Sequence, residues 1–331
     1  MQKLEVSLAV GLYDRTFPLF DGQVAIEGCN VNPVPLLPEE CFHRAFKFAE
    51  FDITEMSLSS HTVMTSAGRA QYVGIPAFTS RAFRHSGIYI RTDRGITRPE
   101  DLKGRTIGLP EYQQTANVFI RGFLQDEHGV KATDIVWRSG GVEEPGRGER
   151  APINLPPGID LAPVPDERTL SDMLAKGEID GMMSARAPSA FLKRAPGVGR
   201  LFPDYAAAEE DYFKRTKIFP IMHLIGIRRS LVERHPWLPV SVYKAFAKAK
   251  EMAIDELGII GHLAVTLPWP VAAQERARRI IGDDYWSYGN TEQNRHVLET
   301  FMRYAHEQGL IAKPMPWEAL FASSTLELSK I

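Results

Sequence analysis

The sequence predicts an α/β protein in which mixed, mostly parallel sheets are flanked by helices and the chain folds into two lobes. Three observations support this prediction. The 331 residues are about twice a typical domain length. Short apolar segments that suit strands alternate with segments of helical periodicity, which is the pattern of βα units. Hydrophobic residues make up 44% and charged residues 24% of the chain, as in an ordinary globular protein.

The composition also excludes several functional classes. The 39 basic and 41 acidic residues give a formal net charge of -2, without the basic excess that is typical of a nucleic-acid-binding domain. Two cysteines, Cys29 and Cys41, are too few for a disulfide-built scaffold, and we expect both to be free thiols. Uninterrupted apolar segments of about 18 residues are absent, so no membrane span is expected. The first ten residues lack the pattern of a secretory signal, which favours the cytoplasm.

The N-terminal part of the chain predicts two βα units. Residues 1–10 alternate polar and apolar side chains, as a half-buried strand does, and a second extended segment covers 29–35. A helix is predicted from Pro38 to about Glu50 because its apolar residues follow helical spacing: these are Phe42, Ala45, Phe46 and Ala49. A short strand over 51–56 then ends in a run of serines.

A second set of elements occupies the middle of the chain. Strands are predicted over 105–109 and 179–184, and helices over 112–128 and 170–176. Gly129 suits the position just past a helix end, because glycine readily adopts the left-handed conformation that terminates many helices.

Two further segments complete the chain. Residues 140–157 are rich in Gly, Pro, Glu and Arg and show neither period, which predicts a long surface loop. They contain neither Gly-Lys-Ser/Thr nor Gly-x-Gly-x-x-Gly, so no phosphate-binding loop is expected. From about Arg215 the composition changes again: residues 218–227 form an apolar extended run, and helices dominate after Pro239.

Six short blocks of the sequence form a pattern that extends over the chain. They are YDRT at 13–16, EMSLSS at 55–60, SRAFRH at 80–85, PEYQ at 110–113, FPIMH at 219–223 and NRHVLETF at 294–301. In this order they resemble the 4,5-dihydroxyphthalate decarboxylase family. The similarity runs from the first strand to residues 317–321, essentially the whole chain, and is much more specific than a single short motif.

The resemblance implies a type 2 periplasmic-binding-protein-like fold with a ligand cleft between its two lobes. Mapped onto this chain, a discontinuous first lobe would comprise 1–90 plus 220–331, and an inserted second lobe would comprise 91–219. Changes in composition near Arg91 and near Arg215 agree with these crossovers.

The resemblance also implies an activity. The chain would convert 4,5-dihydroxyphthalate to 3,4-dihydroxybenzoate and CO2, as a carboxy-lyase without a cofactor. Its partner would be a small aromatic dicarboxylate substrate, with no nucleic acid and no membrane; a homo-oligomer is compatible with this prediction. The alternative is a non-catalytic binding protein for an aromatic or other small carboxylate. Binding proteins of this fold normally carry export signals, so the missing signal favours the enzyme.

Such a decarboxylation needs a proton donor more than it needs a cofactor. Direct loss of CO2 would leave an aryl carbanion, which is too unstable at neutral pH. Protonation of the ring carbon that bears the departing carboxylate avoids the carbanion, because the phenol para to this carbon releases electron density. The site then needs cations or helix-end N–H groups for a carboxylate, a general acid near the ring, and an acceptor for the phenol.

Histidines and arginines near predicted strand ends and crossovers supply the main candidates. His223 and His85 are the predicted acid–base residues, because histidine is best matched to proton transfer near neutral pH. The alternative for each is a buried ring that is hydrogen-bonded to the backbone. Arginine can hold a carboxylate through two parallel bonds, and a surface or structural role is the alternative. The predicted substrate-binding arginines are Arg15, Arg81, Arg84 and Arg186.

Hydroxyl groups and one helix start complete the predicted site. Ser57 and Ser59 follow a strand and are expected to bond a phenol or a carboxylate, with helix N-cap duty as the alternative. Tyr112 and Thr115 open a helix whose free N–H groups favour an anion. Glu111, if it lines the cleft, is expected to pair with an arginine or to accept a phenol proton.

Metal and acyl-transfer chemistry lack support in the sequence. Neither a His-x-His pair nor a His-Glu-x-x-His helix is present, and the cysteines lie twelve residues apart without flanking pairs. No Gly-x-Ser-x-Gly elbow is present. Trp269 is a candidate for stacking on the substrate ring, with core or turn packing as the alternative, and His61 ranks below the other histidines.

Overall fold

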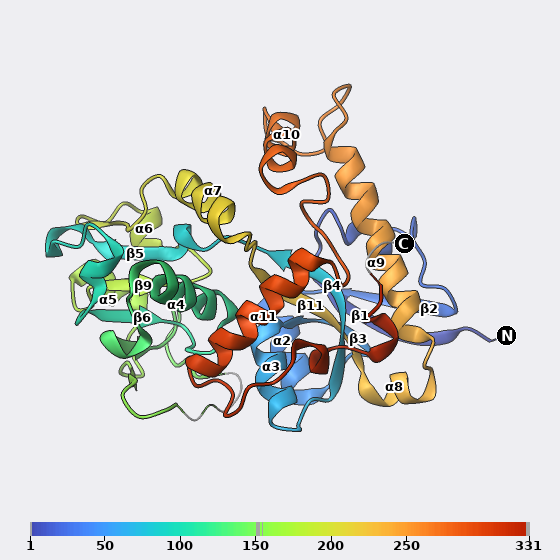
Figure 1. Ribbon diagram of the computed structural model, residues 1–331, viewed down its shortest axis with the longest axis horizontal. Helices are drawn as coiled ribbons and strands as arrows, with labels where there is room; N and C mark the ends of the chain where they lie inside the picture. Colours follow the sequence, from blue (N-terminus) through green and yellow to red (C-terminus); the bar gives the residue numbers. More distant parts are fainter. Residues whose placement is uncertain (1, 150–152, 154, 329–331) are drawn as a thin grey trace. The chain divides into compact units, whose positions relative to one another are not determined.

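The computed structural model describes residues 2–149, 153 and 155–328. The chain divides into two compact units: the first comprises Met1–Arg81, Thr216–Glu299 and Met315–Ile331, and the second comprises Ala82–Arg215 and Thr300–Pro314. Each unit contains one mixed sheet with accompanying helices (Figure 1). This is the α/β architecture with two sheets that the sequence predicts.

The sheet of the first unit has five strands in the order β2-β1-β3-β11-β4. Their bounds are Leu4–Val10 (β1), Cys29–Pro35 (β2), Ile53–Ser57 (β3), Tyr72–Arg81 (β4) and Ile221–Arg228 (β11). β2, β1 and β3 run parallel, whereas β11 is antiparallel to both of its neighbours, β3 and β4. A strand from the second half of the chain therefore lies inside a sheet that is otherwise built from N-terminal strands.

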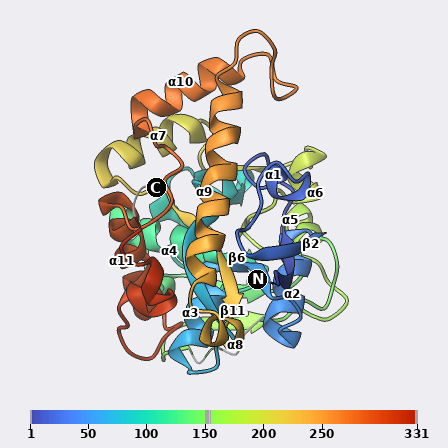
Figure 2. The same ribbon diagram turned by 90° about the vertical axis from the view of Figure 1, so that its right-hand side faces the viewer.

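Helices of the first unit accompany this sheet. Their bounds are Phe17–Phe20 (α1), Pro38–Phe48 (α2), Leu58–Ser66 (α3), Arg229–Arg234 (α8), Leu238–Leu257 (α9) and Pro270–Ile281 (α10), while Glu292–Glu307 (α11) is shared between the units. Proline lies in the first turn of α2, α9 and α10, where its missing N–H group is not needed. α9 contacts β4, and Figure 2 shows α10 at the end of α9.

The sheet of the second unit has six strands in the order β10-β5-β9-β6-β7-β8. The strands are Ile88–Arg91 (β5), Thr106–Leu109 (β6), Val136–Ser139 (β7), Asp160–Pro163 (β8), Gly181–Met183 (β9) and Val198–Arg200 (β10). The accompanying helices are Thr115–His128 (α4), Leu170–Lys176 (α5), Ser189–Leu192 (α6) and Tyr205–Thr216 (α7). β5 is antiparallel to β9 and β10, and the remaining pairs are parallel. α4 ends at Gly129 with a φ of 62°, as the sequence predicts.

The two units differ from the proposed lobes in three places, the smallest of which is that residues 216–219 belong to the first unit. Residues 82–90 join the second unit, because β5 pairs with β9 and β10. Residues 300–314 also join it, because Phe301 and Tyr304 of α11 contact the ring of Phe119 on α4 at centroid distances of 5.4 and 6.2 Å. Neither boundary coincides with a change in composition, so the local sequence gives no sign of it.

The predicted surface loop contains neither helix nor strand in its described part, which is 140–149, 153 and 155–157. Residues 150–152 and 154 of that prediction lie outside the described residues. Strand β8 follows directly. The sequence pattern does not indicate this strand, because its four residues are exposed or only partly buried.

Both cysteines are free and buried, which confirms the sequence prediction. Cys41 belongs to a core cluster with Ala9, Phe42 and Phe51. Its Sγ lies 3.2 Å from the hydroxyl oxygen of Thr54, and burial raises the pKa of the thiol to about 12. The thiol is therefore neutral at physiological pH and acts as a small packing residue.

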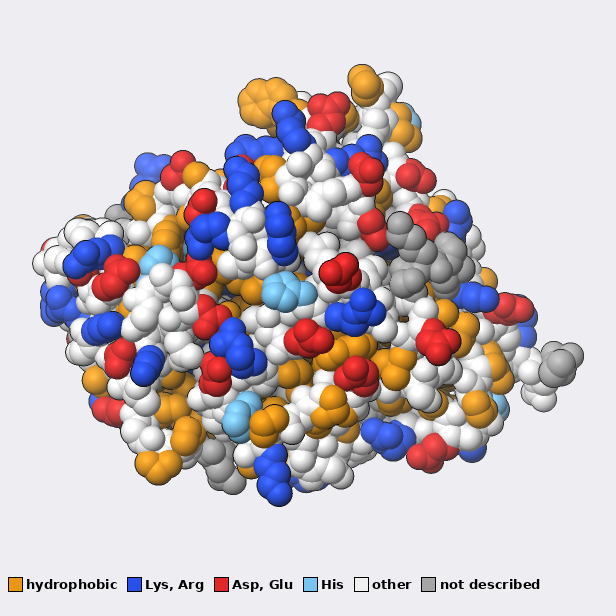
Figure 3. Space-filling model, in the orientation of Figure 1, with side chains coloured by type: hydrophobic (Ala, Val, Ile, Leu, Met, Phe, Trp, Pro, Cys, Tyr) orange, Lys and Arg blue, Asp and Glu red, His pale blue; other side chains and the backbone are white. Residues whose placement is uncertain are grey.

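The described surface has no large excess of either charge on the face drawn in Figure 3, where basic and acidic side chains are interspersed. This distribution agrees with the formal net charge of -2. Among the described residues, no helix combines the length and the apolar character that crossing a membrane requires.

Candidate active site

A buried carboxylate on β3 forms the centre of a hydrogen-bonded cluster in the first unit. Glu55 is 0% exposed. Its Oε2 accepts from the backbone N–H of Gly11 at 3.0 Å, and the hydroxyl oxygen of Tyr13 lies 3.1 Å from both carboxylate oxygens. Its Oε1 accepts from the Thr79 hydroxyl at 3.0 Å and lies 2.8 Å from Nδ1 of His223. We call these five residues the Glu55 cluster.

The Glu55 carboxylate is ionised in this environment. Burial alone raises the pKa of a carboxyl group, but bonds from His223, Gly11 and Thr79 outweigh this effect and hold the pKa of Glu55 below its ordinary value. A backbone N–H can only donate, and an ionised carboxylate accepts through both oxygens. A fixed negative charge therefore lies next to the imidazole ring.

Strand pairing explains why Glu55 and His223 meet although 168 positions separate them in sequence. In the antiparallel pair of β3 and β11, His223 lies opposite Ser57 and Ile225 lies opposite Glu55. Residues two apart on a strand share a face, so Glu55 and His223 are diagonal neighbours on one face of the sheet, within reach of long side chains. The ring of Phe42 on α2 packs edge-on against His223 at 4.8 Å.

The turn after β1 places Tyr13 in the cluster. The Tyr13 ring folds back over Gly11, where a Cβ would lie 2.3 Å from the ring carbon Cζ, so only glycine fits this position without movement. Thr16 closes the turn: its Oγ1 donates to the Gly11 carbonyl at 2.7 Å and accepts from the Tyr13 N–H at 2.9 Å. Burial and the adjacent Glu55 charge raise the pKa of the Tyr13 phenol.

Arg15 lies beside the cluster between two aromatic rings. Its guanidinium carbon is 4.4 Å from the ring centroid of Tyr13 and 4.5 Å from that of Trp286. Nε donates to the carbonyl of Thr79 at 2.6 Å, and Nη1 pairs with Asp14 at 3.0 Å. The Arg15 side chain is 18% exposed. Because Thr79 also belongs to the Glu55 cluster, one residue connects this partly exposed cation to the buried carboxylate.

Curated relatives of this chain carry one name. A 4,5-dihydroxyphthalate decarboxylase of Comamonas testosteroni is 49% identical over 333 residues, which cover 100% of both chains. The chain belongs to the 4,5-dihydroxyphthalate decarboxylase family. A 4,5-dihydroxyphthalate decarboxylase of Pseudomonas putida is 50% identical over 216 residues, which cover 65% of this chain and 83% of that relative. No protein-family model matches the sequence.

Solved structures of low sequence identity share the fold of this decarboxylase family member. A periplasmic sulfonate-binding protein of Methylobacillus flagellatus KT aligns with a TM-score of 0.50 at 16% identity, over 97% of this chain and 92% of that chain. A protein of Bordetella bronchiseptica RB50 aligns with a TM-score of 0.52 at 17% identity, over 98% and 96%. The chain therefore has the periplasmic-binding-protein-like fold that its sequence implies.

The structure places three residues of the predicted decarboxylase site close together. His223 and Arg15 lie at the Glu55 cluster, and Ser57 lies opposite His223 in the sheet. The Ser57 hydroxyl accepts from the N–H of Ser60 at 3.4 Å, so Ser57 also serves as the N-cap of α3. Ser59 lies in the first turn of α3 and is 0% exposed. The substrate-binding roles of these residues stay predictions.

Arg81 has internal partners that the sequence does not reveal. Its Nη1 donates to the carbonyl of Phe219 at 3.1 Å, and Nη2 donates to the carbonyl of Ser287 at 2.8 Å and to Oδ1 of Asn294. Burial lowers the pKa of Arg81 to about 9. A cation that already holds three acceptors of the fold has little capacity left for a substrate carboxylate, so the contacts support a structural role.

The remaining predicted cations lie in the second unit. Arg84 is half-buried; burial lowers its pKa to about 10, against the opposing effect of the nearby Glu209 charge. Arg186 is exposed, and its backbone N–H donates to the Ser184 hydroxyl at 3.1 Å. The Glu55 cluster lies wholly in the first unit, so its contacts do not test the predicted roles of Arg84 and Arg186.

The predicted anion site before α4 is occupied by the chain itself. The carboxylate of Glu149 accepts from the backbone N–H groups of Tyr112 and Gln113, the latter at 3.2 Å. Tyr112 is 0% exposed, and its hydroxyl donates to the carbonyl of Gln308 at 3.2 Å. Thr115 is the first residue of α4 and is also buried. In this structure the acceptor of these N–H groups is a side chain of the same unit, and the predicted substrate-binding roles of Tyr112 and Thr115 stay predictions.

His85 packs within aromatic side chains of the second unit. Its ring stacks on Phe123 at a centroid distance of 4.3 Å and an angle of 10°, with Phe202 and Tyr212 at 5.1 and 5.2 Å. His85 is 4% exposed, and burial lowers its pKa to about 4. These contacts are consistent with a packing role for His85. Its acid–base role stays a prediction.

Replacement of His85 by phenylalanine is expected to flatten the dependence of stability on pH. In the folded state the pKa is about 4, whereas an unfolded histidine titrates near pH 6.5. The unfolded state therefore binds more protons between these values, and the free energy of unfolding falls as the pH falls through this window. In the variant this fall in the free energy of unfolding, on the order of 2 kcal/mol, is expected to disappear. Urea unfolding at pH 4.5 and 7 measures it, and a fall in kcat at unchanged stability would support the acid–base role instead.

Three other candidates from the sequence, Glu111, Trp269 and His61, lie outside the Glu55 cluster. Glu111 pairs with Arg147, one of the two roles expected for it. Trp269 is 76% exposed at the N-cap of α10, which excludes packing in a core. His61 bonds the carbonyl of Leu320 at 2.9 Å, and burial lowers its pKa to about 4.

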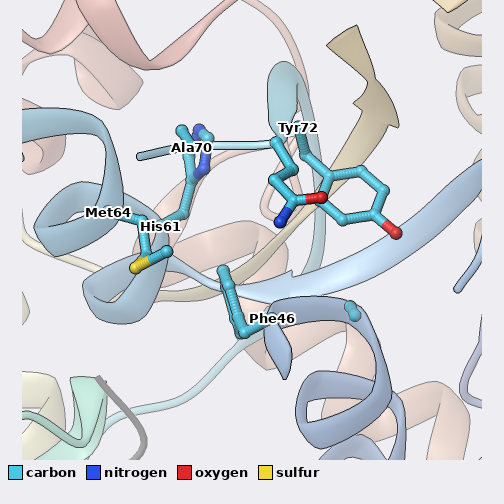
Figure 4. Close-up of a pocket in the computed structure, with 7 residues that line it drawn as sticks. Phe46, His61, Met64, Ala70 and Tyr72 are labelled. Atoms are coloured by element: carbon cyan, nitrogen blue, oxygen red, sulfur yellow. The ribbon is translucent and has the colours of Figure 1, made fainter. Parts of the chain in front are cut away.

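The pocket drawn in Figure 4 is separate from this chemistry. It is a small depression lined by Ala45, Phe46, His61, Met64, Ala70, Gln71 and Tyr72. None of its lining residues belongs to the Glu55 cluster. Among the described residues, no group of three or more His, Cys, Asp or Glu side chains is arranged to hold a metal ion.

Sequence reasoning missed the carboxylate at the centre of the site. Glu55 stands in a strand whose five residues are all buried. The only charged residue of this buried strand is the signal that would have identified it, because a buried charge needs a partner. Trp286 also went unnoticed; its indole N–H donates to the carbonyl of Phe78 at 3.0 Å, which fixes the ring against Arg15.

Proposed function

We propose that this chain is a carboxy-lyase that converts 4,5-dihydroxyphthalate to 3,4-dihydroxybenzoate and CO2 without a cofactor. The observation that carries the proposal is the pairing of His223 with an ionised Glu55, beside the partly exposed cation Arg15, in a chain 49% identical over its full length to a curated 4,5-dihydroxyphthalate decarboxylase. A histidine that carries a proton and a cation that holds a carboxylate are the two groups that this chemistry most needs.

The reaction consumes one proton. The substrate dianion takes up H⁺ at the ring carbon that bears the departing carboxylate, and the para phenol supplies the electron density. The C–C bond then breaks, its electron pair restores the aromatic ring, and CO2 leaves. One dianion and one proton thus give one CO2 and the monoanion of 3,4-dihydroxybenzoate, so that atoms and charge balance.

His223 is the general acid in this proposal. Its Nδ1 faces Glu55, and within the described residues no hydrogen bond is formed at Nε2. The side chain is 17% exposed. Nε2 is therefore the nitrogen that is available to deliver a proton to a bound ring, within hydrogen-bond reach as general acid catalysis requires.

Arg15 binds a carboxylate of the substrate in this proposal. Its Nε is engaged by Thr79, and the sandwich between Tyr13 and Trp286 restricts the guanidinium plane. A pre-oriented guanidinium loses little conformational freedom when it binds a planar anion. Trp286 is partly buried and offers an aromatic surface next to the cation.

For the other residues of the predicted site, a role in substrate binding or catalysis stays a prediction. They are His85, Ser57, Ser59, Arg81, Arg84, Tyr112, Thr115 and Arg186. A cytoplasmic location and a homo-oligomeric state likewise stay predictions.

Replacement of Arg15 by glutamine is expected to raise KM for 4,5-dihydroxyphthalate by roughly 10–100-fold, the usual worth of a hydrogen bond to a charged group. Glutamine keeps a polar side chain but removes the charge and the second donor. Steady-state kinetics measures the change. Arg44→Gln is the matched control, because Arg44 pairs with the surface carboxylates Glu40 and Glu50, lies over the ring of Phe51 and is not part of the Glu55 cluster. An unchanged KM in the Arg15 variant would show that another cation binds the substrate carboxylate.

The activity itself is tested with purified protein that has been treated with a chelator. The expected result is conversion of 4,5-dihydroxyphthalate to 3,4-dihydroxybenzoate with release of one CO2. Ultraviolet absorbance follows the aromatic product, and a CO2 assay measures the gas. Tight binding without turnover would instead identify a carboxylate-binding protein. A panel of analogues that lack one phenol or one carboxylate defines which groups turnover requires.

A further inference from the structure

The hydrogen bonds around Glu55 determine which nitrogen of His223 carries a proton. Oε1 of the ionised carboxylate accepts, so Nδ1 at 2.8 Å must be the donor. The second ring nitrogen, Nε2, is then the one that gains and loses a proton. The opposite tautomer would place a bare Nδ1 lone pair against a carboxylate oxygen, and the contact would be repulsive.

The carboxylate is itself held in place by three groups besides His223. Oε2 accepts from the Gly11 N–H, the Tyr13 hydroxyl lies against both oxygens, and Thr79 donates to Oε1. Each of these groups is fixed in turn: Gly11 and Tyr13 by their turn, and Thr79 by its position in β4. A carboxylate with this many fixed donors has one orientation, and it imposes that orientation on the imidazole.

Glu55 is the group that determines the charge next to His223. The neighbouring titratable and charged groups are Tyr13 and Arg15 from the turn after β1, Cys41 from α2, and Tyr288 from the segment before α11. Burial raises the pKa of both phenols, and that of the thiol to about 12, so these three groups are neutral near pH 7. Arg15 is directed to the carbonyl of Thr79 and to Asp14.

We propose that Glu55 is a positioning residue for the decarboxylation: it fixes the Nδ1–H tautomer and the orientation of His223, which leaves Nε2 as the nitrogen that delivers a proton to the substrate ring. This inference rests on the proposed function. In the step concerned, the Nε2–H bond breaks as the ring C–H bond forms. Loss of CO2 then returns the electron pair to the ring, and Nε2 regains a proton from water. No oxidant or reductant takes part.

The tautomer is measured without substrate, by 15N NMR of protein labelled in its histidines. The nine histidines give separate ring signals, and a His223→Gln variant assigns those of His223. At a pH at which the ring is neutral, the expected result for the wild type is a protonated Nδ1 and a bare Nε2. In Glu55→Gln the neutral amide removes this preference, and the Nε2–H form is expected to increase. A wild-type ring with a bare Nδ1 overturns the proposal.

Kinetics supplies the second readout. In Glu55→Gln, kcat is expected to fall by roughly 10²-fold or more, as when the carboxylate of a histidine–carboxylate pair is neutralised, while KM stays within about twofold because substrate contacts are untouched. Asp52→Asn is the matched control: Asp52 lies just before β3 and accepts from the N–H and hydroxyl of Ser7, without contact to the imidazole. An equal loss of kcat in both variants would indicate a structural effect and overturn the proposal.

The two readouts also separate this inference from the proposed function. If the wild type shows no decarboxylation, the function fails while the NMR result still decides whether Glu55 controls the His223 tautomer. If the wild type is active but Glu55→Gln keeps both the tautomer and kcat, the function stands and the positioning role fails. If Glu55→Gln does not fold, the wild-type tautomer alone decides.

Discussion

Replacement of His223 by glutamine is expected to lower kcat for 4,5-dihydroxyphthalate by roughly 10²–10⁴-fold, the usual contribution of a general acid. Glutamine is close in size to histidine, and its amide N–H can still donate to Glu55, so the buried carboxylate keeps a partner. The fold should be retained, and the expected loss lies in the chemical step. Single-turnover kinetics with saturating substrate measures it directly.

A matched control is available on the neighbouring helix. His43 is exposed on α2, one residue from the Phe42 that contacts His223. His43→Gln removes an imidazole from the same helix without touching the Glu55 cluster, and its kcat should equal that of the wild type. Near-wild-type turnover in His223→Gln would refute the assignment of His223 as the acid.

Replacement of Arg81 by methionine is expected to produce a large loss of stability, about 3 kcal/mol or more, because it removes three buried hydrogen bonds from a charged donor. Three acceptors are affected: the carbonyls of Phe219 and Ser287 and the Oδ1 of Asn294. Arg81 is 5% exposed and ends β4, so water cannot replace the guanidinium without opening the structure. Denaturant unfolding at pH 7 measures the change in free energy.

The same variant separates the structural role of Arg81 from the predicted carboxylate clamp. If Arg81 is structural, KM measured on the folded fraction should change little while the midpoint of unfolding falls. A large rise in KM at unchanged stability would instead support a role of Arg81 in binding the substrate carboxylate. Arg44→Met on the surface of α2 is the comparison, since exposed ion pairs contribute little to stability.

Much of the fold could be predicted because its signals are local. The alternation of polar and apolar residues in β1, the spacing of apolar residues in α2 and the glycine after α4 each involve a few consecutive residues. The unit boundaries are different in kind. They depend on which sheet β5 joins and on what the second half of α11 covers, and both follow from contacts between distant segments.

In the candidate site, too, some residues could be identified from local sequence, whereas others depend on contacts between distant segments. His223 was predictable because a histidine at the start of an apolar strand, within a block that resembles a known family, is a chemical signal by itself. Its partner Glu55 was not, because the two residues meet only through the pairing of β3 with β11. Local sequence also cannot tell an acid–base histidine from one that stacks on Phe123, since both are histidines next to apolar residues.

The interior position of β11 has a consequence for how the protein is made. A ribosome completes β3 and β4 long before it reaches residue 221, and the entire second unit, apart from 300–314, is synthesised in between. Until β11 emerges, β3 and β4 lack their common neighbour, and each presents an unpaired edge that invites association with other nascent chains. During the same interval Glu55 lacks the imidazole of His223, its partner in the folded protein. The strand that completes the sheet and the histidine proposed for catalysis therefore arrive together, late in translation.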